Sequence, residues 1–151
     1  MAANDWHNPE LSSVSIVVVD DDYDIAHMNS LVLQARGYRV RVAHNGQQAI
    51  NLIDEALPDC ILLDVAMPGT DAFGVIEHLA QRKDFPLSRI ILQSGNLDHE
   101  NMQRARYSSV SRFLRKPYTM PEMLDCVVRC LQDNQGNDNQ NKVNETAPIN
   151  G

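Results

Sequence analysis

Residues 60–68, CILLDVAMP, place a carboxylate, Asp64, at the end of a short apolar run. Apolar runs of this length, bounded by turn residues, are typical of strands that are buried on both faces. In open parallel sheets, ligands bind just beyond the carboxyl ends of the strands. The pattern therefore predicts that Asp64 lies at a binding edge. An aspartate that only caps the following helix has the same local pattern.

Four other segments also have the character of strands, and helical spacing follows each of the five. The predicted strands are 15–19, 39–43, 60–63, 89–93 and 112–115, and the predicted helices cover about 24–36, 45–55, 72–83, 98–107 and 119–132. Strands that alternate with helices predict an α/β domain with a mostly parallel sheet. The segment 98–107 has a thin apolar stripe, so we expect the fourth helix to pack weakly.

The helix boundaries are marked by residues that commonly begin or end helices. The first helix is predicted to turn Ile25, Met28, Val32 and Ala35 toward the core, with Gly37 placed to end it. The predicted caps at the starts of helices are Asp22 or Asp24, Asn45, Asp71, and Thr119 with Glu122.

Length and composition predict one ordinary domain of 14–132. Residues 1–13 are expected to be a flexible lead-in, and the Asn/Gln-rich residues 133–151 a disordered tail. The formal charge is −7 and no Lys/Arg-rich run occurs, which argues against direct nucleic-acid binding. No apolar run approaches membrane-spanning length, and the amino terminus lacks a signal pattern, so we expect no membrane association and a cytoplasmic location.

Polar residues end four of the five predicted strands. Asp20 and Asp21 follow the first, Asp64 the third, Ser94 the fourth and Lys116 the fifth. Carboxylates that are held together repel one another unless they share protons or bind a cation, and an all-oxygen cluster suits Mg²⁺. A lysine and a serine nearby could contact phosphoryl oxygens. The group therefore suits an aspartate that accepts a phosphoryl group.

These residues resemble the receiver domains of bacterial two-component response regulators, in particular stand-alone receivers similar to chemotaxis regulators. The resemblance covers 15–132 and is carried by VVVDDD, DVAMPG, Ser94, Phe113 and Lys116-Pro117, in the order of the family. It implies the flavodoxin-like fold, with five helices around a five-stranded sheet in the order 2-1-3-4-5. It also implies a cis peptide bond before Pro117.

The resemblance implies a role for each residue. Asp64 would accept the phosphoryl group from a histidine kinase or a histidine phosphotransfer protein. Ser94 and Lys116 would contact that group, and Ser94 and Phe113 would act as the switch. Mg²⁺ would be held by Asp20, Asp21, Asp64 and the backbone carbonyl of Ala66. The chain would not be an enzyme, apart from self-phosphorylation by small donors and autodephosphorylation. It would signal to an unidentified protein through the fourth helix, fifth strand and last helix, with or without dimerisation.

Several alternatives stay open. Asp71-Ala72 replaces the Asp-Gly that is usual in this family, which leaves room for a degenerate receiver that only binds proteins. A Mg²⁺-dependent phosphohydrolase with an aspartyl nucleophile is a second alternative, and a fragment whose output domain lay beyond Gly151 is a third. Asp22 could also take the place of Asp21, and Phe113 could be an ordinary core residue.

Overall fold

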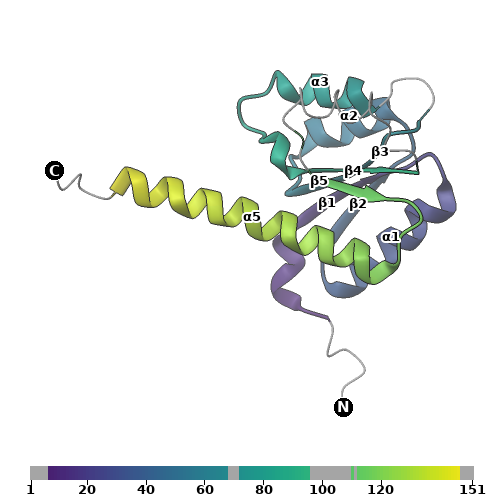
Figure 1. The fold of residues 1–151 in the computed structure, drawn as a ribbon, viewed down its shortest axis with the longest axis horizontal. Coiled ribbons are helices and arrows are strands. Elements are labelled where there is room, and N and C mark those ends of the chain that lie inside the picture. Colours follow the sequence, from purple (N-terminus) through teal and green to yellow (C-terminus); the bar gives the residue numbers. More distant parts are fainter. Residues whose placement is uncertain (1–6, 68–71, 96–109, 111, 147–151) are drawn as a thin grey trace, which may run out of the picture.

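The computed structural model of the 151-residue chain describes residues 7–67, 72–95, 110 and 112–146, and the side chains of these residues as far as 134. Its centre is a five-stranded sheet (Figure 1). All neighbouring strands are parallel, in the order β2-β1-β3-β4-β5. The strands are β1 Ser15–Val19, β2 Arg39–Ala43, β3 Cys60–Asp64, β4 Ile90–Ser94 and β5 Arg112–Arg115. The predicted α/β class, parallel sheet and strand order are confirmed.

Helices cover both faces of this sheet. The described part of the chain contains α1 Tyr23–Arg36, α2 Gly46–Glu55, α3 Ala72–Ala80 and α5 Met120–Thr146, with short 3₁₀ helices η1 Pro9–Ser13 and η2 Leu87–Arg89. Helices α2 and α3 lie on one face, and α1 and α5 on the other (Figure 1). The fourth predicted helix, 98–107, lies outside the described residues.

The two faces of the sheet are filled by alternate residues of the same strands. Val17 and Val19 of β1 belong to the core under α2 and α3, whereas Ile16 and Val18 belong to the core under α1 and α5. All four side chains are fully buried. This is the expected result of the two-residue period of a strand that is covered on both faces.

Helix α1 presents to the core a face that overlaps only in part with the predicted one: Val32 packs against the core as predicted. Its buried residues are Ala26, Asn29, Ser30 and Leu33. Met28, which was predicted to point inward, is 51% exposed. Small or hydrogen-bonded side chains let the helix approach the sheet closely, and apolar spacing alone does not reveal this when large apolar residues lie on several sides of a helix.

Helix ends follow the predicted signals where the structure describes them. Asp22 caps α1 by accepting hydrogen bonds from the backbone N–H groups of Asp24 and Ile25, and Asn45 caps α2 through the N–H of Gln48. Gly37 ends α1 with φ of +118°, where a side chain would also meet the carbonyl oxygen of Asn8. The predicted cap Asp71 lies outside the described residues.

The two ends of the chain differ in part from expectation. Within the predicted flexible lead-in, residues 9–13 form η1, and the Asn8 N–H donates to the Arg36 carbonyl at 2.9 Å. Helix α5 continues to Thr146, beyond the end predicted near Gln132, and projects from the body of the molecule (Figure 1). Asn and Gln do not interrupt a helix that has already begun, so composition alone places its end poorly. The division into lead-in, domain and tail stays a prediction.

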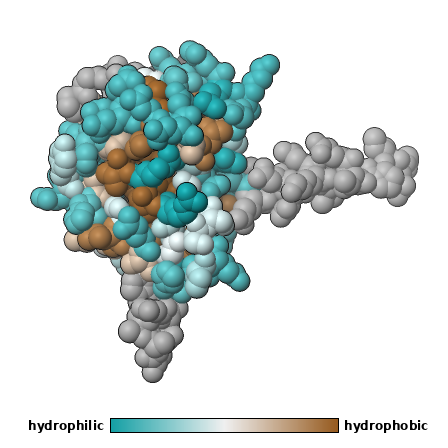
Figure 2. Space-filling view, turned by 180° about the vertical axis from the view of Figure 1, so that it is seen from behind, coloured by the Kyte–Doolittle hydropathy of each residue, from teal (hydrophilic) through white to brown (hydrophobic). Residues whose placement is uncertain are grey.

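Hydrophilic side chains cover much of the face opposite to that of Figure 1, with apolar surface gathered near its middle (Figure 2). The large apolar side chains that are most exposed among the described residues belong to α1: Tyr23, Met28 and Leu31. None of the described helices is long and apolar enough to cross a membrane.

Candidate functional site

The carboxyl ends of the parallel strands bring the predicted polar residues to one edge of the sheet. Asp20 directly follows β1, Asp64 is the last residue of β3, and Lys116 directly follows β5. The edge is continued by backbone hydrogen bonds, because the Val65 N–H donates to the Gln93 carbonyl and the Lys116 N–H to the Ser94 carbonyl, both at 2.9 Å. The sheet therefore fixes the backbone from which the site side chains project.

Asp20 is fully buried, and several donors hold its carboxylate. Its Oδ1 accepts the Asp22 N–H at 2.9 Å. Its Oδ2 accepts Lys116 Nζ at 3.1 Å and Gln93 Nε2 at 3.2 Å. A buried carboxylate with these partners is oriented before any ligand arrives.

Asp64 lies beside it and is 2% exposed. Its Oδ1 accepts the Ala66 N–H at 3.2 Å and lies 3.5 Å from Lys116 Nζ. Burial and the charge of Asp20 raise the pKa of Asp64 to about 7, against the lowering effects of Lys116 and the Ala66 N–H. Without a metal ion the site therefore holds more negative charge than its one lysine balances.

Lys116 is the cation that contacts both buried acids. Burial alone would lower the pKa of its ammonium group, but the hydrogen bond to Asp20 and the charges of Asp64 and Asp20 raise it above the usual value. The lysine is thus charged at neutral pH. The Lys116–Pro117 peptide bond is cis, as the resemblance implies.

Asp20, Asp21 and Asp64 form an acidic cluster that fits a small divalent cation. One carboxylate oxygen from each lies within 4.8 Å of those of the other two. Asp20 and Asp64 are buried and Asp21 is exposed, so the cluster is open on one side. Hard oxygen donors with an open side suit Mg²⁺, which keeps several of its waters when bound. Asp22 caps α1 instead of joining the cluster.

The structure also locates the other predicted residues. Ser94 ends β4 and is 3% exposed, one residue beyond Gln93, which is paired with Asp64. Ala66 is exposed next to the cluster. Phe113 is half-buried on β5 and packs against the core under α2 and α3. Of these residues only Ser94 ends a strand, and the roles of all three stay predictions.

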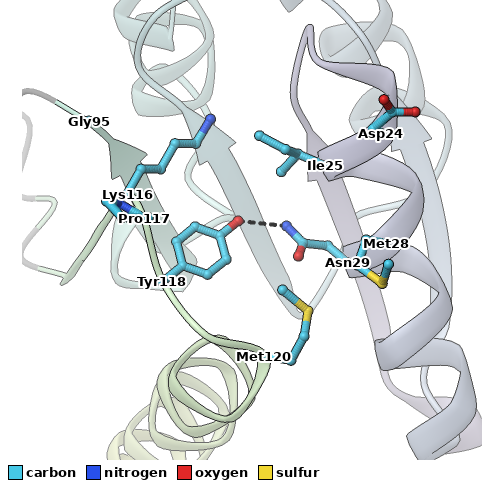
Figure 3. A pocket seen from close by; sticks show the side chains of 9 residues that line it. All are labelled: Asp24, Ile25, Met28, Asn29, Gly95, Lys116, Pro117, Tyr118 and Met120. Atoms are coloured by element: carbon cyan, nitrogen blue, oxygen red, sulfur yellow. Dashed lines mark hydrogen bonds between the residues drawn. The ribbon is translucent and has the colours of Figure 1, made fainter.

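Three polar residues near the site were not predicted: the fully buried Gln93 and Asn29, and the half-buried Tyr118. The Tyr118 hydroxyl donates to Gln93 Oε1 at 2.5 Å, and Asn29 Nδ2 donates to the Tyr118 hydroxyl at 2.7 Å. Asn29 and Tyr118 line a cavity of about 640 Å³ between α1 and the start of α5, and Lys116 lies at its edge (Figure 3). The signal available in the sequence was the polar Gln93 directly after the apolar residues 90–92.

The strand order and the acidic cluster define a doubly wound α/β domain with a metal-compatible acidic site at the carboxyl edge of its sheet. Residues 16–128 match the family model of the response regulator receiver domain. The chain therefore belongs to the receiver domain family of response regulators.

Solved structures agree with this assignment. The chemotaxis protein CheY4 of Vibrio cholerae is 28% identical, with a TM-score of 0.71 over 78% of this chain and 98% of that one. A putative response regulator of Chloroflexus aurantiacus is 30% identical, with a TM-score of 0.69 over 79% and 98%. The receiver domain of a signal transduction histidine kinase of Syntrophus aciditrophicus is 25% identical, with a TM-score of 0.72 over 80% and 92%.

Proposed function

We propose that the chain accepts a phosphoryl group on Asp64 in the presence of Mg²⁺. The observation that carries this proposal is the placement of the buried Asp64 carboxylate between Lys116 and the acidic pair at the carboxyl edge of a receiver domain. The donor would be a phosphohistidine of a histidine kinase or phosphotransfer protein. Such donors act in the cytoplasm, which is the location we propose.

Each residue has a chemical task in this reaction. A carboxylate oxygen of Asp64 forms a bond to phosphorus as the bond from phosphorus to the histidine nitrogen breaks, and the histidine then takes up a proton. Asp20, Asp21, Asp64 and the Ala66 carbonyl would hold Mg²⁺, which when bound offsets the negative charge of the acids and of the incoming group. Lys116 lies near enough to contact a phosphoryl oxygen on Asp64. The Ser94 hydroxyl would donate a hydrogen bond to a second phosphoryl oxygen.

Phosphorylation would add a charge of roughly −1.5 to −2 beside Ser94 and Lys116. We propose that Ser94 and Phe113 shift in response, and that the output surface comprises the predicted fourth helix, β5 and α5. The partner is a protein that this surface binds in one state only, and a second copy of the chain is one such partner. Neither nucleic acid nor a membrane is part of this proposal.

The proposal is tested by intact mass after incubation with acetyl phosphate and Mg²⁺, beside a sample containing a chelator. We expect a single phosphoryl adduct that requires Mg²⁺ and disappears when the chelator is present. No adduct, together with no binding of Mg²⁺, would instead identify a degenerate receiver that binds proteins constitutively. Continuous release of phosphate from small phosphate esters would identify a phosphohydrolase.

Adjacent acids should differ sharply in their effect on Mg²⁺ affinity. Asp21→Asn should weaken Mg²⁺ binding roughly 10-fold or more, because it removes a charged ligand from the cluster. Asp22→Asn should leave the affinity nearly unchanged, because asparagine caps helices about as well as aspartate. Isothermal titration with MgCl₂ measures both. Equal losses in the two variants would contradict this assignment of the ligands.

A further inference from the structure

A line of hydrogen-bonded polar side chains leads from α1 to the acidic cluster. Asn29 donates to Tyr118, Tyr118 donates to Gln93, and Gln93 donates to Asp20. Asn29, Gln93 and Asp20 are each fully buried. We call these four residues the relay. They come from four different elements or connections, so the tertiary fold alone brings them together.

All three hydrogen bonds of the relay run in one direction. Each residue donates a hydrogen bond to the next, and the last acceptor is the Asp20 carboxylate. Burial raises the pKa of Tyr118, so its hydroxyl keeps its proton at neutral pH. The chain of donors ends on a carboxylate oxygen, and each hydrogen bond polarises the next.

The relay gives Asp20 a fixed donor that is independent of Lys116. Oδ2 of Asp20 accepts both Gln93 and Lys116, while Oδ1 is held by the Asp22 N–H. Lys116 also contacts Asp64, so it is shared between the two acids. Without Gln93, Oδ2 would lose this donor and keep the lysine that it shares with Asp64.

Gln93 is itself held at both ends of its amide. Its Nε2 needs an acceptor and its Oε1 needs a donor, and Asp20 and Tyr118 supply them. Loss of either partner leaves a buried polar atom unsatisfied, which costs more than the bond itself contributes. The Asp20 carboxylate can only accept, so it sets which way the Gln93 amide faces, and the Tyr118 hydroxyl satisfies the other end of that amide.

We propose that Gln93 is a positioning residue for Asp20 as a metal ligand, and that Tyr118 and Asn29 hold Gln93 in place. The proposal rests on the Mg²⁺ site described under the proposed function. Some residues hydrogen-bond to a metal ligand without contacting the metal and so orient that ligand. Removing such a residue commonly lowers metal affinity 10-fold or more. The relay thus makes the metal affinity of the acidic cluster depend on residues that never contact the ion.

The test is Mg²⁺ affinity measured by isothermal titration on the full chain. Gln93→Met keeps the length of the side chain and removes both hydrogen bonds, and we expect roughly 10-fold weaker binding. Tyr118→Phe removes one hydroxyl, and we expect roughly 3-fold weaker binding. Because both act through one amide, the double variant should bind no more weakly than Gln93→Met alone.

Tyr38→Phe is the matched control. Tyr38 is a buried tyrosine that begins the connection into β2, at the opposite edge of the sheet. Tyr38→Phe also removes one hydroxyl, and this variant should bind Mg²⁺ as tightly as the unaltered chain even if its thermal stability changes. Should Gln93→Met fail to fold, Tyr118→Phe still carries the test.

The outcomes separate this proposal from the proposed function. If the unaltered chain binds Mg²⁺ and both variants bind it equally well, the relay proposal is overturned and the site proposal stands. If the losses of the two single variants add in the double variant, the residues act separately and the relay is also overturned. If the unaltered chain binds no Mg²⁺, both proposals are overturned together.

Discussion

Asp64→Asn is expected to abolish the phosphoryl adduct that acetyl phosphate and Mg²⁺ form on this chain. An amide cannot supply the anionic oxygen that bonds to phosphorus, and asparagine is close in shape to aspartate, so the sheet edge should stay intact. Asp64 is 2% exposed, and its carboxylate accepts a hydrogen bond from the Ala66 N–H. The amide oxygen of asparagine can accept the same hydrogen bond. Intact mass would show no adduct at any incubation time at which the unaltered chain is modified.

Asp59→Asn is the matched control, because Asp59 directly precedes the same strand at its other end. Its Oδ2 accepts the Ser15 N–H at 2.8 Å, a bond that an asparagine oxygen can make. The control should be phosphorylated like the unaltered chain. An adduct that persists on Asp64→Asn would show that another residue accepts the group, and peptide mapping would locate it.

The positions of the acids could be predicted because sequence order and sheet geometry together determine them. Each residue of the site directly ends or follows an apolar strand, and parallel strands end at one edge. Asp20, Asp64 and Lys116 are accordingly within hydrogen-bond or ion-pair distance of one another or of a shared partner. The resemblance favoured Asp21 over the alternative Asp22, and the structure places Asp21 in the acidic cluster and Asp22 at the start of α1.

The relay could not be predicted because its members are far apart in the sequence and each is ordinary alone. Asn29 lies on a face of α1 that apolar spacing did not identify, since the predicted face included the exposed Met28. Tyr118 lies in the connection between β5 and α5, where no periodic pattern indicates which way a side chain points. The length of α5 was also not predicted, because the helix continues through Gly136 and the Asn/Gln-rich segment that follows Gln132.

The contribution of Asp64 to the free energy of unfolding of the metal-free chain should fall as the pH rises from about 4 to about 7. The pKa of Asp64 is about 7 in the folded chain and near 3.8 when unfolded, so over this interval the folded state holds a proton that the unfolded state has released. This contribution therefore decreases with rising pH and levels off above pH 7. A difference of about three units between the folded and unfolded pKa values corresponds to roughly 4 kcal/mol of unfolding free energy for an isolated group. We expect a change of about 2 to 4 kcal/mol because Lys116 shares the site.

Asp64→Asn isolates this effect from every other titrating group. An amide resembles the protonated carboxyl, so the variant and the unaltered chain should be about equally stable near pH 4. The variant should be more stable by about 2 to 4 kcal/mol at pH 8, by denaturant unfolding with a chelator present. Saturating Mg²⁺ should reduce that gap, because the ion stabilises only the folded state and binds the carboxylate better than the amide. Parallel stability curves from pH 4 to 8 would show instead that Lys116 already balances Asp64, and that the acidic cluster needs no cation to be stable.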